Sequence, residues 1–128
     1  MEGDEYVATV LVVDDTLFMR VTISNMFTEL GYEVVGKAVN GKEAVDMYRE
    51  LQPDLVTMDV TMPVMSGIVA VKKIITEFPN AKIIMITALG LQKLIVEAIE
   101  NGAKDFITKP FELERLKAVA DQLLGQNC

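Results

Sequence analysis

Short apolar runs alternate with amphipathic stretches along this chain. The runs are rich in β-branched residues and lie at about 7–13, 33–39, 54–59, 82–87 and 104–108. Their length and composition predict buried strands. Between and after them, apolar residues recur at helical spacing, at about 19–30, 41–51, 68–78, 91–101 and 113–124. The first of these helices is expected to end at Gly31 and the third before Pro79.

Strict alternation of strand and helix predicts right-handed βαβ units, and therefore an α/β fold with a doubly wound parallel sheet. The run at 33–39 contains Glu33 and Lys37 and is the least apolar, so we place it at one edge of the sheet. The short run at 104–108 is expected at the other edge. With 128 residues, the chain suits a single domain, 1–128, whose core spans about 7–124.

Composition narrows the classes of function. The chain has 12 basic and 19 acidic residues, a net charge of −7, which disfavours binding to nucleic acid or to an anionic membrane. It has no histidine, so it supplies no imidazole base, phosphohistidine or histidine metal ligand. The single cysteine, Cys128, has no partner for an internal disulfide. No leader and no apolar run of about 20 residues is visible, so we expect a cytoplasmic protein.

Polar residues gather where the predicted strands end. Asp14 and Asp15 follow the first strand, Asp59 ends the third, Thr87 the fourth, and Lys109 follows the fifth. The carboxyl ends of parallel strands share one edge, where open α/β sheets bind ligands. Clustered carboxylates repel one another unless a cation or a reaction requires them, and their oxygens suit Mg²⁺. The sequence therefore predicts a metal-binding acidic site.

The same residues suit the transfer of a phosphoryl group. A carboxylate can attack phosphorus and become an aspartyl phosphate, while a lysine and a threonine hydroxyl bind the phosphoryl oxygens. One lysine and one divalent cation balance the formal charge of the aspartates, and a phosphoryl group adds about one negative charge. If Thr87 then moves toward the phosphoryl group, the 88–91 loop moves with it. We expect such a movement to act as a switch.

Four motifs carry a resemblance to a known family. They are Asp14-Asp15, the run Met58-Asp59-Val60-Thr61-Met62-Pro63 with Gly67, Thr87-Ala88, and Lys109-Pro110-Phe111. Together and in this order they resemble the receiver domain of two-component response regulators, most of all the single-domain chemotaxis regulators of the CheY type. The resemblance covers residues 7–124 and implies a flavodoxin-like sheet in the order 2-1-3-4-5.

The resemblance also implies roles for individual residues. Asp59 would accept a phosphoryl group from a histidine kinase of the CheA type. Asp15, Asp59 and the backbone carbonyl of Thr61 would bind Mg²⁺ directly, and Asp14 would act largely through water. Lys109 and Thr87 would contact the phosphoryl group. Such a protein catalyses its own phosphorylation and dephosphorylation but is not a turnover enzyme.

Further implications concern signalling. Phe106 occupies the position of a switch aromatic that is often tyrosine, although it could equally be a packing residue. Thr61 and Leu89 occupy positions whose side chains tune dephosphorylation in the family. The chain would be a monomer whose 91–124 face binds a downstream protein, such as a flagellar or archaellar motor component or an adaptor. Regulation of another phosphorelay or kinase pathway is the alternative.

The same residues also allow other interpretations. Asp14 or Asp15 could be a helix N-cap, Thr87 a strand-end hydroxyl, and Lys109 a loop lysine. The spacing G-x-x-x-x-G-K at 36–42 resembles a nucleotide-binding loop, but Glu43 stands where Ser or Thr is required, and a turn with a helix start is favoured. A haloacid-dehalogenase-like phosphohydrolase would carry D-x-D-x-T after the first strand, and a flavin carrier would carry a Ser/Thr/Gly-rich loop there. The chain has neither.

Overall fold

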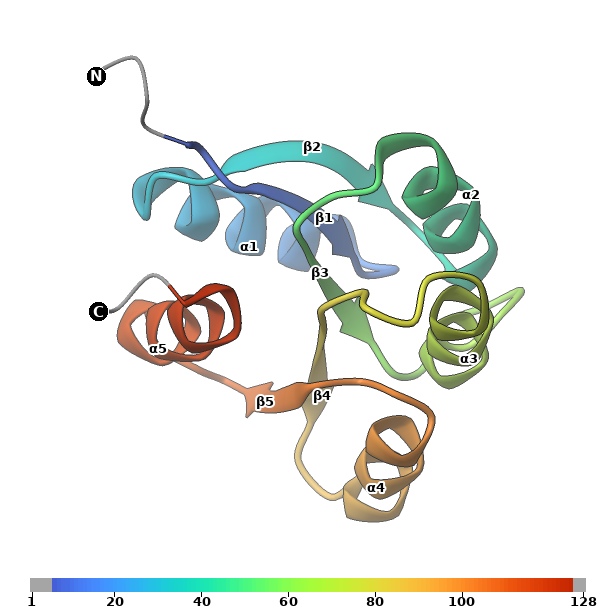
Figure 1. Cartoon of the computed structure of the whole chain (residues 1–128). Coiled ribbons are helices and arrows are strands. Elements are labelled where there is room, and N and C mark those ends of the chain that lie inside the picture. Colours follow the sequence, from blue (N-terminus) through green and yellow to red (C-terminus); the bar gives the residue numbers. More distant parts are fainter. Residues whose placement is uncertain (1–5, 126–128) are drawn as a thin grey trace.

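One parallel sheet organises the computed structural model, which describes residues 6–125 and leaves Cys128 outside the described part. Its strand order is β2-β1-β3-β4-β5 (Figure 1). The strands are β1 (Thr9–Val13), β2 (Glu33–Ala38), β3 (Leu55–Asp59), β4 (Ile83–Ala88) and β5 (Asp105–Lys109). Every neighbouring pair is parallel. The predicted order and both predicted edge strands are confirmed.

Helices cover both faces of the sheet. They are α1 (Leu17–Glu29), α2 (Gly41–Leu51), α3 (Gly67–Glu77), α4 (Gln92–Glu100) and α5 (Leu113–Leu124). Figure 1 shows α1 and α5 on one face and α2, α3 and α4 on the other. No helix within residues 6–125 is long and apolar enough to cross a bilayer.

The apolar strands result from burial on both faces. Val10 and Val12 of β1 pack in the cluster that includes residues of α1 and α5. Leu11 and Val13 pack in the other cluster, with residues of α2 and α3. All four are at most 1% exposed. Because successive side chains point to opposite faces, a strand covered on both sides must be apolar at every position.

The helix starts differ in one respect from the expectation. Thr16, not Asp14 or Asp15, is the N-cap of α1, and its side chain accepts a hydrogen bond from the Met19 N–H. The N-cap interpretation of the two aspartates was therefore wrong. Asn40 caps α2 by accepting from the Glu43 N–H at 2.8 Å, as expected for a turn and helix start. The preceding Gly36 lies within β2 rather than in a phosphate-binding loop.

Candidate functional site

The predicted acidic residues meet at the carboxyl edge of the sheet. Asp14 and Asp15 follow β1, and Asp59 ends the adjacent β3. One carboxylate oxygen from each of these aspartates lies within 4.8 Å of the others. We call these three residues the acidic cluster. Oxygen ligands at this spacing fit a hard cation such as Mg²⁺, which binds a few carboxylates and keeps several waters.

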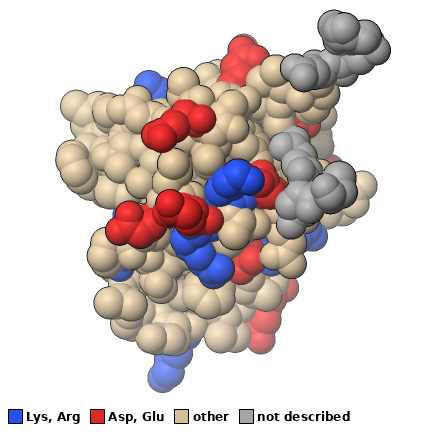
Figure 2. All heavy atoms as spheres, turned by 90° about the vertical axis from the view of Figure 1, so that its left-hand side faces the viewer, with Lys and Arg blue, Asp and Glu red and all other residues tan. Residues whose placement is uncertain are grey.

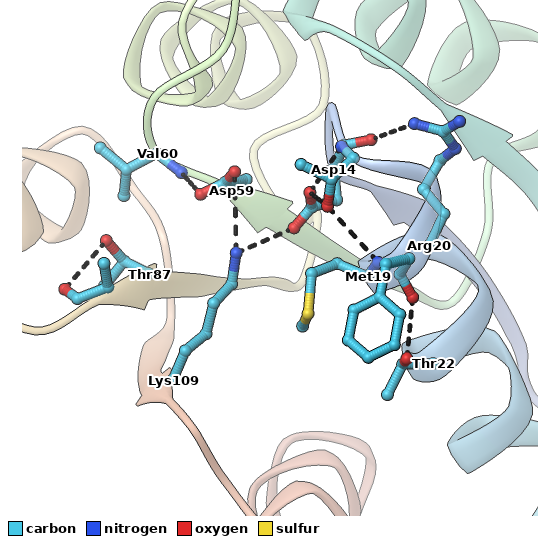
Figure 3. A network of polar contacts seen from close by, with 11 residues as sticks. Asp14, Met19, Arg20, Thr22, Asp59, Val60, Thr87 and Lys109 are labelled. Carbon is cyan, nitrogen blue, oxygen red and sulfur yellow. Dashed lines mark hydrogen bonds and ion pairs between the residues drawn. The ribbon is translucent and has the colours of Figure 1, made fainter.

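Asp14 is the buried and fully anchored member of the cluster, at 1% exposure. Its Oδ1 accepts hydrogen bonds from the backbone N–H and the hydroxyl of Thr16, both at 3.0 Å. Its Oδ2 accepts from Lys109 Nζ at 3.0 Å (Figure 3). Its backbone N–H donates to the Ala38 carbonyl at 3.1 Å. Asp15, by contrast, is exposed. These bonds fix Asp14 in place. Asp15 is accessible to a cation because it is exposed.

Asp59 lies between these extremes, with its side chain 13% exposed. Its Oδ1 accepts from the Val60 N–H at 2.8 Å, and its Oδ2 lies 3.8 Å from Lys109 Nζ. Burial raises the pKa of Asp59 from 3.8 to about 6, against the opposing effect of the Lys109 ammonium. The neighbouring Asp14 and Asp15 raise this pKa further, but less than burial does. Loss of hydration, more than mutual repulsion, therefore makes the charged Asp59 costly.

Thr87 and Lys109 reach the same edge from β4 and β5. The strand register pairs Asp59 with Ile86, and Thr87 with Thr108, so Thr87 lies at the end of the strand beside Asp59. Thr87 is fully buried, and within residues 6–125 its hydroxyl makes only a long 3.5 Å hydrogen bond, to the Ala88 carbonyl. Figure 3 shows Lys109 reaching toward both Asp14 and Asp59. The Lys109–Pro110 peptide bond is cis.

Phe106 lies apart from the acidic cluster. It is on β5, is 37% exposed, and its backbone carbonyl accepts a hydrogen bond from Arg115 Nη2 at 3.4 Å. Phe106 lines a hollow of about 320 Å³ together with Gly90, in the loop between β4 and α4, and Ile95 of α4. The ring therefore adjoins the loop that follows Thr87.

The sequence interpretation missed Arg20 and Thr16. The Arg20 Nη1 donates to the Asp14 backbone carbonyl at 2.8 Å, and Thr16 holds the Asp14 carboxylate. Both act on the segment between β1 and α1. The signal was present, because Arg20 follows the N-cap Thr16 by four residues, one helical turn, which places its long side chain above the same corner.

The 60–66 loop joins β3 to α3 and contains Thr61, the predicted carbonyl ligand of the metal. Within it, Val64 has a φ of 69° although it is β-branched, and its side chain is 78% exposed. The left-handed region costs an L-residue roughly 1–2 kcal/mol, and asparagine tolerates it far better than valine. The loop next to the acidic cluster therefore carries backbone strain.

Replacing Val64 with Asn should stabilise the protein by about 0.5–1 kcal/mol, because the strain is relieved and little burial is lost. Urea denaturation followed by circular dichroism measures this difference. Val96→Asn is the matched control. Val96 is 55% exposed on α4, where the backbone is helical and Asn, which favours turns over helices, should not stabilise the protein. A less stable Val64→Asn variant would contradict the assignment of strain to this residue.

Comparisons with known proteins agree with this geometry. The family model described as "Response regulator receiver domain" matches residues 10–121. The chain is 56% identical over 107 residues to "Chemotaxis protein CheY" of Thermotoga maritima, covering 84% of this chain and 89% of the relative. It is 51% identical over 116 residues to "Protein CcdB" of Bacillus subtilis, covering 91% and 97%.

A solved structure is also similar to this chain. The CheY of a CheX-CheY-BeF3-Mg²⁺ complex from Borrelia burgdorferi is similar, with a TM-score of 0.87 and 35% identity, covering 91% of this chain and 89% of that chain. These findings do not favour the phosphohydrolase alternative. Response regulator receiver domains are signalling proteins rather than turnover enzymes, and an acidic pocket that binds Mg²⁺ is typical of them. The chain belongs to the response regulator receiver domain family.

Proposed function

We propose that this protein is a stand-alone chemotaxis response regulator that accepts a phosphoryl group on Asp59 from a histidine kinase of the CheA type. One observation carries the proposal. Asp59 is partly buried, 3.8 Å from the Lys109 ammonium, and has oxygens of Asp14 and Asp15 within 4.8 Å. This arrangement provides a nucleophile, a cation that binds phosphoryl oxygens, and ligands for Mg²⁺.

In the proposed transfer, an Asp59 carboxylate oxygen attacks phosphorus on the phosphohistidine of the kinase. A P–O bond to Asp59 forms while the P–N bond breaks, and the departing imidazole nitrogen keeps the electron pair and takes a proton from solvent. This chain has no histidine, so it cannot itself supply the phosphohistidine. Mg²⁺ bound by Asp15, Asp59 and the Thr61 carbonyl, with Asp14 acting through water, would neutralise charge on the phosphoryl oxygens. The same site would catalyse hydrolysis of the aspartyl phosphate.

Two residues are suited to detect the new charge. The Lys109 ammonium lies 3.0 Å from Asp14 and 3.8 Å from Asp59, so it can turn to a phosphoryl group on Asp59 while staying next to the acidic cluster. Among the described residues, a 3.5 Å hydrogen bond is all that holds the Thr87 hydroxyl, so it can rotate or shift toward a better acceptor. A shift of Thr87 would move the following loop, and with it the hollow beside Phe106. This sequence of movements is the proposed switch.

Exposed apolar side chains support a protein as the phosphoryl donor. Leu17 and Phe18 at the start of α1, Val64 after β3 and Leu89 after β4 are 66–78% exposed. All follow strands whose carboxyl ends meet at the acidic edge. Apolar groups gathered around a polar site are typical of surfaces that bind another protein. A donor that reaches Asp59 would cover them.

The assignment to chemotaxis rests on relatives. The chain covers about nine tenths of the CheY of Thermotoga maritima, which is named for chemotaxis, whereas "Protein CcdB" is not. We therefore keep another phosphorelay or kinase pathway as the second candidate. The downstream partner would be a motor component or an adaptor that binds the 91–124 face. Charged residues of both signs there suit selective contacts; they are Lys93, Glu97, Lys104, Glu112, Arg115 and Lys117.

We propose a monomer that acts in the cytoplasm and binds neither nucleic acid nor membrane. Its net charge of −7 disfavours polyanionic ligands. On the face seen in Figure 2, basic side chains lie among acidic ones rather than in a separate patch.

The experiment that tests this function is phosphorylation by a small donor. Incubation with acetyl phosphate should add the mass of one phosphoryl group, about 80 Da, only when Mg²⁺ is present. The Asp59→Asn variant should gain none. Gain of the same mass without Mg²⁺ would argue against the proposed metal site.

Replacing Lys109 with Met should separate phosphorylation from signalling. The variant should still gain one phosphoryl group. It should lose most of the phosphorylation-dependent binding of the downstream partner, because no ammonium at position 109 can move toward the negative phosphoryl group. The measurement is a pull-down with and without beryllofluoride and Mg²⁺. Lys42→Met is the matched control, since Lys42 pairs only with Asp46, at 3.0 Å on the exposed surface of α2, among the interactions of residues 6–125. Full partner binding by the Lys109 variant would contradict its signalling role.

A further inference from the structure

We infer that Gly41 is a positioning residue for the metal-binding 60–66 loop, an inference that rests on the proposed function. Gly41 is the first residue of α2 and is buried. In the sequence it is separated from the loop by the rest of α2, by the connection that follows and by β3, and it is not a candidate ligand. Its effect on the metal site would act through the backbone of the loop.

A backbone hydrogen bond joins Gly41 to the loop. The Gly41 N–H donates to the Met65 carbonyl at 2.9 Å. At the other end of the loop, the Gly67 N–H donates to the Val60 carbonyl at 2.8 Å. The loop is therefore held by hydrogen bonds at both Val60 and Met65, and Thr61 and Val64 lie between them.

The contact leaves no room for a side chain. A Cβ atom on Gly41 would lie 2.5 Å from the Met65 carbonyl oxygen and 2.8 Å from the Ser66 carbonyl oxygen. Both neighbours are backbone atoms, which cannot rotate away as a side-chain end can. Any other residue at position 41 would therefore displace either the loop or the start of α2.

The loop needs such a support because it is strained. Val64 holds a φ of 69°, which a free loop would relax. Magnesium requires near-ideal octahedral geometry, so a ligand carbonyl must be held accurately before the ion binds. By holding Met65, Gly41 would keep the loop, and with it the Thr61 carbonyl, in place relative to Asp59. Groups that orient metal ligands in this way typically change metal affinity by about 10–100-fold when removed.

The test compares Gly41→Ala with Gly36→Ala, the same change at a site that does not touch the loop. The atoms nearest to a Cβ on Gly36 would be side-chain atoms, Leu51 Cδ1 at 3.0 Å and Leu11 Cδ1 at 3.1 Å. Mg²⁺ affinity is measured by titration calorimetry at a temperature where circular dichroism shows both variants folded. We expect Gly41→Ala to bind Mg²⁺ about tenfold more weakly than wild type. Gly36→Ala should keep nearly wild-type affinity, even if it melts at a lower temperature.

Unchanged affinity in folded Gly41→Ala, or an equal loss in both variants, would overturn the inference. If Gly41→Ala does not fold, amide hydrogen exchange of the wild type decides. Saturating Mg²⁺ should slow exchange of the Gly41 N–H severalfold, while the Gln52 N–H at the far end of α2, bonded to the Tyr48 carbonyl, should change little. Equal changes at the two amides would overturn the inference. Absence of Mg²⁺ binding by the wild type would instead contradict the proposed function.

Discussion

Without metal at pH 7.5, Asp59→Asn should be more stable than wild type by up to about 3 kcal/mol, the equivalent of the rise in the pKa of Asp59 from 3.8 to about 6. Burial is the main cause, because it disfavours the charged form. A raised pKa means that the folded protein holds the proton more tightly than the unfolded chain does. The resulting stabilisation is complete only below the unfolded pKa of 3.8 and is lost as the pH rises through about 6. An amide, which does not ionise, avoids this loss.

The difference between the two proteins should therefore depend on pH. Urea unfolding at several pH values should show the advantage of Asp59→Asn growing between pH 4 and pH 7 and shrinking when Mg²⁺ binds the wild type. Asp46→Asn is the control for removal of a negative charge, because Asp46 is 54% exposed on α2. An advantage of equal size at pH 4 and pH 7.5 would show that burial of a charged Asp59 is not its source.

Gly67→Ala should destabilise the protein by about 3 kcal/mol or more. A Cβ on Gly67 would lie 1.9 Å from the Asp59 carbonyl oxygen and 3.0 Å from Met58 Cγ. Asp59 cannot retreat, because it ends a central strand with neighbours on both sides. The substitution must therefore push α3 and the strand end apart, which damages both the fold and the acidic cluster. Thermal melting and urea unfolding measure the loss.

Gly90→Ala separates this steric effect from the loss of glycine itself. Gly90 has a φ of 90°, but apart from its chain neighbours no atom of residues 6–125 would lie within 4 Å of a Cβ there. Its replacement should cost only about 1 kcal/mol, from the backbone conformation alone. If Gly67→Ala costs no more than Gly90→Ala, the close approach of α3 to Asp59 is not rigid.

The fold could be predicted because its sequence signals are physical requirements. Strands buried on both faces must be apolar throughout, as Val10 to Val13 are. Parallel strands also bring their carboxyl ends together, which predicted the meeting of Asp14, Asp15, Asp59 and Lys109. One edge strand, at 33–39, was predicted from its weaker hydrophobicity, and the other, at 104–108, from its short length.

Local sequence patterns alone could not show which of the two adjacent aspartates is buried, and only the family resemblance assigned them different roles. Asp14 and Asp15 are chemically identical, and which one is buried depends on contacts with Thr16, Arg20 and Lys109, the last of these 95 residues away. The positive φ of Val64 was also invisible, because a β-branched residue normally avoids that conformation. Such features result from tertiary contacts that override local preference.

Localisation of the phosphoryl group is the most direct test of the central claim. After reaction with acetyl phosphate and Mg²⁺, borohydride reduction converts an aspartyl phosphate to homoserine, and peptide mass spectrometry identifies the residue. We predict homoserine at position 59 in the wild type and none anywhere in Asp59→Asn. Modification at Asp14 or Asp15, or an unchanged yield in Asp59→Asn, would contradict the assignment of Asp59 as the phosphoryl acceptor.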